Sequence, residues 1–90
     1  MQFDWNGLKG RANERKHGVS FEEASSVFYD DQAVLFDDPD HSEAEDRFLL
    51  VGMSLRLRVL VVVHCVRYGD ETALLQDTEA VAAALREAPA

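Results

Sequence analysis

The stretch of residues 16–24 constrains the fold most, because it ends one helix and begins another. Gly18 stands just past the expected helix end, where a residue without a Cβ adopts the left-handed conformation freely, and His17 would face the carbonyl end of the helix dipole. Ser20 and Glu23 then have the spacing of a capping box. The pattern predicts a corner between two helices.

Periodicity in the remaining sequence predicts a single α+β domain. Apolar residues recur at spacings of three and four between residues 21 and 28, which is typical of a helix, and the apolar run 57–67 is typical of a strand. We expect two N-terminal helices packed on a mostly antiparallel sheet, followed by a C-terminal helix. The expected elements are strands at 2–5, 33–36, 45–53 and 57–67, a first helix that Asn6 or Asp4 caps and that ends near residue 17, further helices at 21–28 and 80–87, and a hairpin turn at 54–56.

Two of the expected helices allow finer predictions. The first would turn Leu8, Ala12 and the stem of Arg15 towards the core, which makes a thin apolar face. The C-terminal helix would be capped by Asp77 or Thr78, because short polar side chains accept hydrogen bonds from free amides at helix starts.

The strand at 57–67 is apolar on both faces. Alternation places His64 and Arg67 on opposite faces, so the two side chains cannot share one site without a bulge. A strand of this kind is usually covered on both sides. We expect helices on one face and the C-terminal segment, a partner chain or a second copy on the other.

Length and composition exclude several classes of protein. Ninety residues allow one domain, and no apolar run reaches the length of a membrane span. The first residues lack the basic and apolar regions of a signal peptide. The single cysteine, Cys65, is expected to be a buried small hydrophobe, which fits a reducing cytoplasm. We therefore expect a cytoplasmic protein that does not bind membranes.

Charge is segregated along the chain, whose net charge is −8. Residues 21–46 contain ten acidic residues and no Lys or Arg, whereas residues 47–68 contain four Arg and no acidic residue. One interpretation is salt bridging between these segments together with a solvated acidic face. The other interpretation is a local basic surface that binds phosphate. It depends on basic residues lying close together, because the overall acidity of the chain disfavours non-specific binding of nucleic acid.

A spaced set of residues runs through the first three-quarters of the chain: Phe3, Trp5, Lys9, Asn13, the Lys16-His17-Gly18-Val19 corner, Val27-Phe28, residues 37–43, Glu45, Arg47, Gly52, Ser54, residues 60–62 and Arg67. Together these residues resemble the BrnT family of bacterial toxins. The resemblance ends after Asp70, where the Ser-Ala-Arg motif and basic final helix of that family are missing. The resemblance therefore leaves three alternatives: an inactive toxin-like protein, a protein with an altered C-terminus, or a divergent member.

The resemblance implies a RelE-like ribonuclease fold and the toxin role in a type II toxin–antitoxin system. Such a toxin would be a metal-independent endoribonuclease that cleaves RNA and inhibits translation until a BrnA-like antitoxin covers it. The assembly would be a homodimer or a toxin–antitoxin hetero-oligomer. The alternative is a catalytically inactive interaction domain that binds an antitoxin or another protein.

Four residues are candidates for phosphate contact and proton transfer in that reaction: Lys16, His17, Arg47 and Arg67. Cleavage of RNA without a metal needs a base, an acid and cations that stabilise charge on phosphorus. A structural role competes with each assignment, since a histidine can cap its own helix and an arginine can pair with the acidic segment. We expect such pairing for at least one arginine.

Other chemistry is not indicated. His64 is expected to be a core residue, and His41 a surface residue in an acidic turn. The acidic residues between 37 and 45 lack the spacing of a calcium loop, and no zinc pattern is present, so no metal or cofactor is expected. Convergence of the basic residues in a concave patch would favour the enzyme, and pairing of each with an acid would disfavour it. These residues are Lys9, Arg11, Lys16, Arg47 and Arg67.

Overall fold

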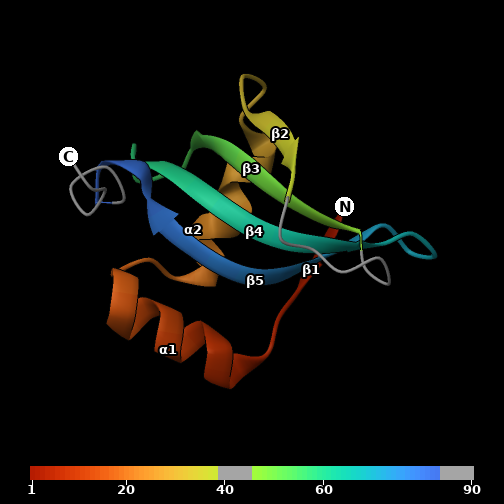
Figure 1. Ribbon diagram of the computed structural model, residues 1–90, viewed down its shortest axis with the longest axis horizontal. Helices are drawn as coiled ribbons and strands as arrows, with labels where there is room; N and C mark the ends of the chain where they lie inside the picture. The colour runs from red at the N-terminus through yellow and green to blue at the C-terminus, as the bar shows by residue number, and fades with distance from the viewer. Residues whose placement is uncertain (39–45, 84–90) are drawn as a thin grey trace.

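The computed structural model describes residues 1–38 and 46–83, which form a five-stranded sheet with one helix packed on a face of the sheet and the first helix beside its edge (Figure 1). The strand order is β1-β5-β4-β3-β2, and only β1 and β5 are parallel, so the prediction of a mostly antiparallel sheet is confirmed. The elements are β1 (Gln2–Asp4), α1 (Gly7–His17), α2 (Phe21–Ser26), the 3-10 helix η1 (Val27–Tyr29), β2 (Val34–Asp37), β3 (Arg47–Met53), β4 (Val59–Arg67) and β5 (Thr72–Ala80).

The corner between α1 and α2 forms as predicted. The Asn6 side chain caps the start of α1, and Gly18 ends it with φ 70° while its amide donates to the Glu14 carbonyl. Ser20 Oγ accepts a hydrogen bond of 3.1 Å from the Glu23 amide at the start of α2. The second half of the predicted capping box is wrong, because the Glu23 carboxylate turns away from Ser20 and towards the β3–β4 hairpin.

The predicted inner face of α1 is also wrong. Leu8 is 72% exposed, Ala12 and Arg15 are exposed, and the buried residue of α1 is Asn13. The reason is that α1 lies beside the outer edge of β5, where unpaired backbone groups need a polar partner rather than an apolar one.

The core lies between α2, η1 and the sheet. The predicted stripe of α2 and η1 is confirmed, since Phe21, Ala24 and Val27 are buried and Phe28 packs beside them. From the strands, the core receives mainly Leu50, Leu60, Val62, Ala73 and Leu75.

The hairpin between β3 and β4 is longer than predicted. Leu57 has φ 61° and donates its amide to the Ser54 carbonyl, so β4 begins at Val59 and not at residue 57. The strands at 33–36 and 45–53 are confirmed in position, with observed bounds of 34–37 and 47–53. Residue 45 lies outside the described residues.

The caps predicted for the C-terminal helix are wrong, and residues 72–80 form a strand that the sequence pattern did not predict. Asp77 and Thr78 do not cap a helix, because both belong to β5, which pairs with β4 from Thr72 to Ala80. Gln76 is the extra residue of a register shift in this pairing. Helical structure begins at residue 81, and residues 84–87 of the predicted helix lie outside the described residues. Helix propensity contributes less to the free energy of folding than the hydrogen bonds and burial that strand pairing supplies here.

The two faces of the sheet differ in cover. Leu60, Val62 and His64 of β4 are buried under the helices, which confirms the expectation for one face. The opposite face, here called the open face, carries the alternate residues of β4, and Val59 is 41% exposed there. The open face therefore remains apolar and partly accessible.

Candidate functional site

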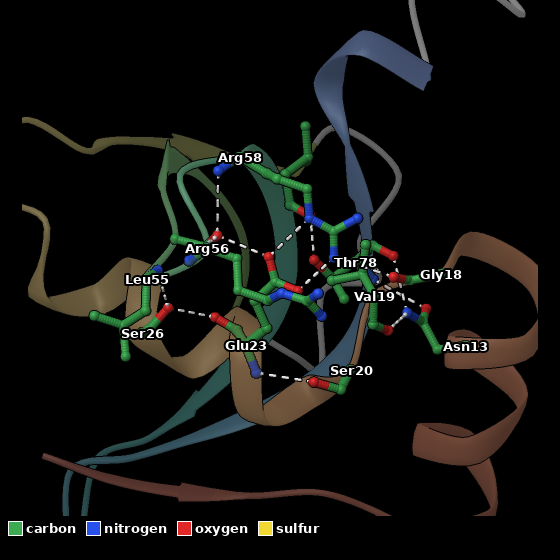
Figure 2. Close-up of polar contacts among 12 residues, drawn as sticks. Asn13, Gly18, Val19, Ser20, Glu23, Ser26, Leu55, Arg56, Arg58 and Thr78 are labelled. Carbon is green, nitrogen blue, oxygen red and sulfur yellow. Dashed lines mark hydrogen bonds and ion pairs between the residues drawn. The ribbon is translucent and has the colours of Figure 1, made fainter.

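Asn13 fastens α1 to the sheet edge (Figure 2). Its Oδ1 accepts from the Thr78 amide at 3.1 Å, and its Nδ2 donates to the Thr78 and Val19 carbonyls at 2.9 Å each. The Asn13 carboxamide thus makes the two backbone hydrogen bonds at Thr78 that a neighbouring strand would otherwise make. Asn13 belongs to the scaffold that positions α1, although its sequence context gave no sign of this role.

A second polar cluster ties α2 to the β3–β4 hairpin (Figure 2). Arg58 pairs with both carboxylate oxygens of Glu23 and donates to the Gly18 carbonyl, while Ser54 Oγ donates to Glu23 Oε2 at 2.7 Å. The Arg58 hydrogen bonds lower the pKa of the Glu23 carboxyl, against the opposing effect of burial. Because its partners come from within the chain, Arg58 is a structural arginine.

One side of α1 and the middle of β5 form a shallow pocket of about 180 Å³. Lys9 Nζ donates to Gln76 Oε1 at 2.6 Å across this pocket. The His17 ring faces two carboxylates, with Nδ1 3.4 Å from Glu79 Oε2 and Nε2 3.7 Å from Asp77 Oδ1. The lining residues are Lys9, Ala12, Asn13, Lys16, His17, Gln76 and Asp77.

This pocket joins two ammonium groups to an imidazole. The ammonium groups of Lys9 and Lys16 can bind a phosphate, and an imidazole held by carboxylates can exchange protons with a bound oxygen. Two of the four candidate residues, Lys16 and His17, therefore share one site. Lys9 joins them there.

Arg47 and Arg67 lie together elsewhere, at the end of the sheet where β3 begins and β4 ends. Arg47 of β3 is opposite Cys65 of β4, and Arg67 lies two positions after Cys65 in β4. Because side chains two positions apart lie on the same face of a strand, both arginines belong to the open face. Arg47 Nε lies 3.1 Å from Asp38 Oδ2, and Arg67 donates twice to Asp70 at 3.1 and 2.9 Å.

These ion pairs settle part of what the charge pattern predicted. Arg47 and Arg58 both pair with carboxylates from the acidic segment 21–46, as expected for at least one arginine. Arg67 pairs locally, and its hydrogen bonds lower the pKa of Asp70 to about 2. Lys9 and Lys16 thus converge in a concave pocket, which favours an enzyme, whereas Arg47 and Arg67 are paired with acidic residues, which disfavours one.

The two groups of candidates are well separated. His17 contacts β5 at Asp77 and Glu79, whereas Arg67 is in register with Thr72. At a rise of about 3.3 Å per residue, the five residues from 72 to 77 span about 16 Å. The four candidates therefore cannot surround a single phosphate.

His64 is a core residue, as predicted. It is 2% exposed and lies between the rings of Phe28 and Phe48, at centroid distances of 4.8 and 5.9 Å. Burial lowers the pKa of its imidazole. The ring also lines a largely apolar pocket of about 220 Å³.

Sequence reasoning missed the β5 residues of the α1–β5 pocket. Asp77 was predicted as a possible helix cap, yet Asp77 and Glu79 are two positions apart, the spacing that places side chains on one side of a strand. That spacing was the available signal. It competed with an alanine-rich sequence that favours helix.

Comparison with known proteins gives the family. In the described residues, no helix has the length and apolar character needed to cross a membrane. A search of curated proteins gave no match. One family profile, described as the ribonuclease toxin, BrnT, of type II toxin–antitoxin systems, matches residues 5–74. Since the match includes α1 to β4 and the start of β5, the chain belongs to the BrnT family of ribonuclease toxins.

Proposed function

We propose that this chain is the toxin of a type II toxin–antitoxin pair and that it cleaves RNA without a metal ion, which inhibits translation. Family membership supports the ribonuclease activity. The observation that carries the assignment of a site is the pocket between α1 and β5, where two lysines and a histidine converge. Arg47 and Arg67 complete the proposed RNA-binding surface.

In the proposed reaction, His17 removes the proton from a ribose 2′-hydroxyl. The 2′ oxygen attacks the adjacent phosphorus, the bond to the 5′ oxygen breaks, and the products are a 2′,3′-cyclic phosphate and a 5′-hydroxyl that takes up a proton. Lys9 and Lys16 stabilise the added negative charge on the phosphoryl oxygens. Asp77 and Glu79, which face the imidazole at 3.7 and 3.4 Å, orient His17 in this proposal.

Arg47 and Arg67 contact neighbouring phosphates of the same strand in this proposal. Both guanidinium groups hold carboxylates in the free protein, so RNA exchanges one anionic partner for another. The partner that silences the toxin is a cognate BrnA-like antitoxin in the cytoplasm, and the two proteins form a hetero-oligomer.

A catalytically inactive interaction domain is the second candidate. Three observations favour it: Arg47 and Arg67 are each paired, His17 faces two carboxylates, and those carboxylates lie beyond the family match, which ends at residue 74. In this interpretation, the Asp77 and Glu79 carboxylates occupy the side of the His17 ring that an RNA phosphate would need to reach.

RNA cleavage by the purified chain in a metal chelator tests the proposal. We expect cleavage that falls about a hundredfold or more in His17→Ala, because a lost general base costs about that much. Lys16→Ala and Arg67→Ala should weaken RNA binding, while the control Arg15→Ala changes an exposed residue of the same helix turn and should retain activity. Cleavage that requires a divalent metal would contradict the mechanism.

The paired variant Asp77→Asn/Glu79→Gln separates the two candidates. If the carboxylates orient His17, their removal lowers the cleavage rate. If they block the site, the natural chain is inactive and the variant binds or cleaves RNA better. An inactive natural chain that still binds an antitoxin would establish the interaction domain.

A further inference from the structure

The strand β2 is an edge strand with unusual exposure. It is last in the strand order, and Val34, Leu35 and Phe36 are 52%, 56% and 51% exposed. Natural edge strands are generally protected by a charge, a proline or a bulge in the strand, because a bare apolar edge pairs with other chains. Val34, Leu35 and Phe36 carry none of those features, and the charge in the strand is confined to its last residue, Asp37. The edge therefore has the character of a surface that is covered in an assembly.

The direction of the backbone groups in β2 follows from its pairing with β3. The Asp38 amide donates to the Arg47 carbonyl, which makes residue 38 a hydrogen-bonded position of this antiparallel ladder. Such positions alternate, so residues 34 and 36 also face β3. The N–H and C=O groups of Leu35 and Asp37 face outwards. They offer two donors and two acceptors to an added strand.

The side chains around this edge form an apolar surface. Val34 and Phe36 are in register with Val51 and Leu49, so they continue the open face at its border. Leu35 projects to the opposite face. An added strand with alternating apolar residues would therefore bury side chains on both sides of the sheet.

The charges at the edge select the kind of partner. Asp31 lies shortly before β2 and Asp37 ends it, and both are exposed. Antiparallel pairing of two copies would gather the acidic groups of both chains along one short interface, in a protein whose net charge is already −8. A strand with Lys or Arg beside its apolar residues would instead neutralise these carboxylates.

We propose that the β2 edge binds an extended segment of a partner protein, with apolar residues at alternate positions and basic residues at its ends. The segment adds a sixth, antiparallel strand and pairs with the outward groups of Leu35 and Asp37. This proposal rests on the proposed function only in identifying the partner as the antitoxin.

Two probes test the surface. The first is a synthetic peptide of alternating valine and threonine with two lysines at each end, compared with the same peptide carrying glutamates. The second is the cognate antitoxin, purified with this chain as a complex. Amide hydrogen exchange should show protection of Leu35 and Asp37 with the lysine peptide and with the antitoxin, and little protection with the glutamate peptide.

Substitutions at one position separate backbone pairing from side-chain contact. Leu35→Pro removes an outward N–H without removing a hydrogen bond to β3, and Leu35→Thr keeps that N–H. We expect Leu35→Pro to weaken binding of the antitoxin at least about tenfold, and Leu35→Thr to weaken it less.

Charge reversal provides a variant that leaves the strand intact. Asp31→Lys/Asp37→Lys should weaken binding about tenfold at low salt, with a smaller loss at high salt. The matched control is Glu14→Lys/Glu22→Lys, which makes the same charge change at exposed helix residues and should bind normally.

Three results would overturn the proposal. They are equal protection by both peptides, protection of the antitoxin complex away from β2, and a concentration-dependent dimer that Leu35→Pro abolishes, which would assign the edge to a second copy. Ribonuclease activity is measured separately, so an inactive chain that binds the lysine peptide would count against the proposed function alone.

Discussion

The two sides of the sheet treat their exposed backbone in opposite ways. On the β5 side, β1 pairs with residues 72–74 and the Asn13 carboxamide pairs with Thr78, so the chain supplies its own partners. On the β2 side, the outward groups of Leu35 and Asp37 have no strand beyond them in the described sheet. The comparison teaches that the chain supplies partners of its own to β5 at residues 72–74 and 78, whereas it supplies none to the outer side of β2 in the described sheet.

Removal of the Asn13 carboxamide should have the largest effect. Asn13→Ala leaves the Thr78 amide and two carbonyls without their partners beside a buried edge, which we expect to lower the free energy of unfolding by about 4 kcal/mol. Urea denaturation followed by circular dichroism measures the loss. A loss below about 1 kcal/mol would mean that water replaces Asn13 and that the β5 edge is not completed by α1.

The Glu23–Arg58 pair should come next. Glu23→Gln is expected to cost about 3 kcal/mol at neutral pH, since it breaks an ion pair with a nearly buried carboxylate. The folded pKa of Glu23 lies below its ordinary value of 4.5, so its stabilisation is present above pH 4.5 and is lost as the pH falls through the folded pKa.

The pH dependence supplies the check on that assignment. Denaturation curves of the natural chain and of Glu23→Gln, measured from neutral pH downwards, should converge below pH 4.5. Curves that stay parallel across this range would show that the carboxylate charge of Glu23 does not contribute to stability.

A methyl group at Gly52 should have an intermediate effect. A Cβ there would lie 2.7 Å from the Ala33 Cβ, and Asp30, which accepts from the Met53 amide at 2.8 Å, lies beside it. We expect Gly52→Ala to cost about 2 kcal/mol, because the segment before β2 must move away from β3. Thermal unfolding gives the loss, and amide exchange in β2 should rise with it. Unchanged exchange in β2 would contradict this coupling.

Substitution at the β2 edge should affect the free chain least. Leu35→Thr changes an exposed side chain and is expected to alter the free energy of unfolding by less than about 0.5 kcal/mol, measured by the same urea titration. A loss above 1 kcal/mol would show that Leu35 supports the fold of the isolated chain. The comparison between a completed edge and an available edge would then fail.

The sequence determined the features that depend on neighbouring residues. Gly18, the Ser20 cap and the apolar spacing from Phe21 to Val27 were enough to place the helix corner, and alternation placed His64 and Arg67 on opposite faces. The same local patterns supported the family resemblance, which the match over residues 5–74 confirms.

The tertiary structure decided the features that depend on distant partners. The segment 72–80 became a strand because β4 and β1 offered hydrogen bonds that outweigh its helix propensity. Asn13 was buried because Thr78, 65 residues away, needed a partner. The candidates divided into two groups because β5 runs back along β4 and brings Asp77 and Glu79 to His17 but not to Arg67. Local sequence sets the conformations that a segment favours, whereas pairing and burial between distant segments select among them.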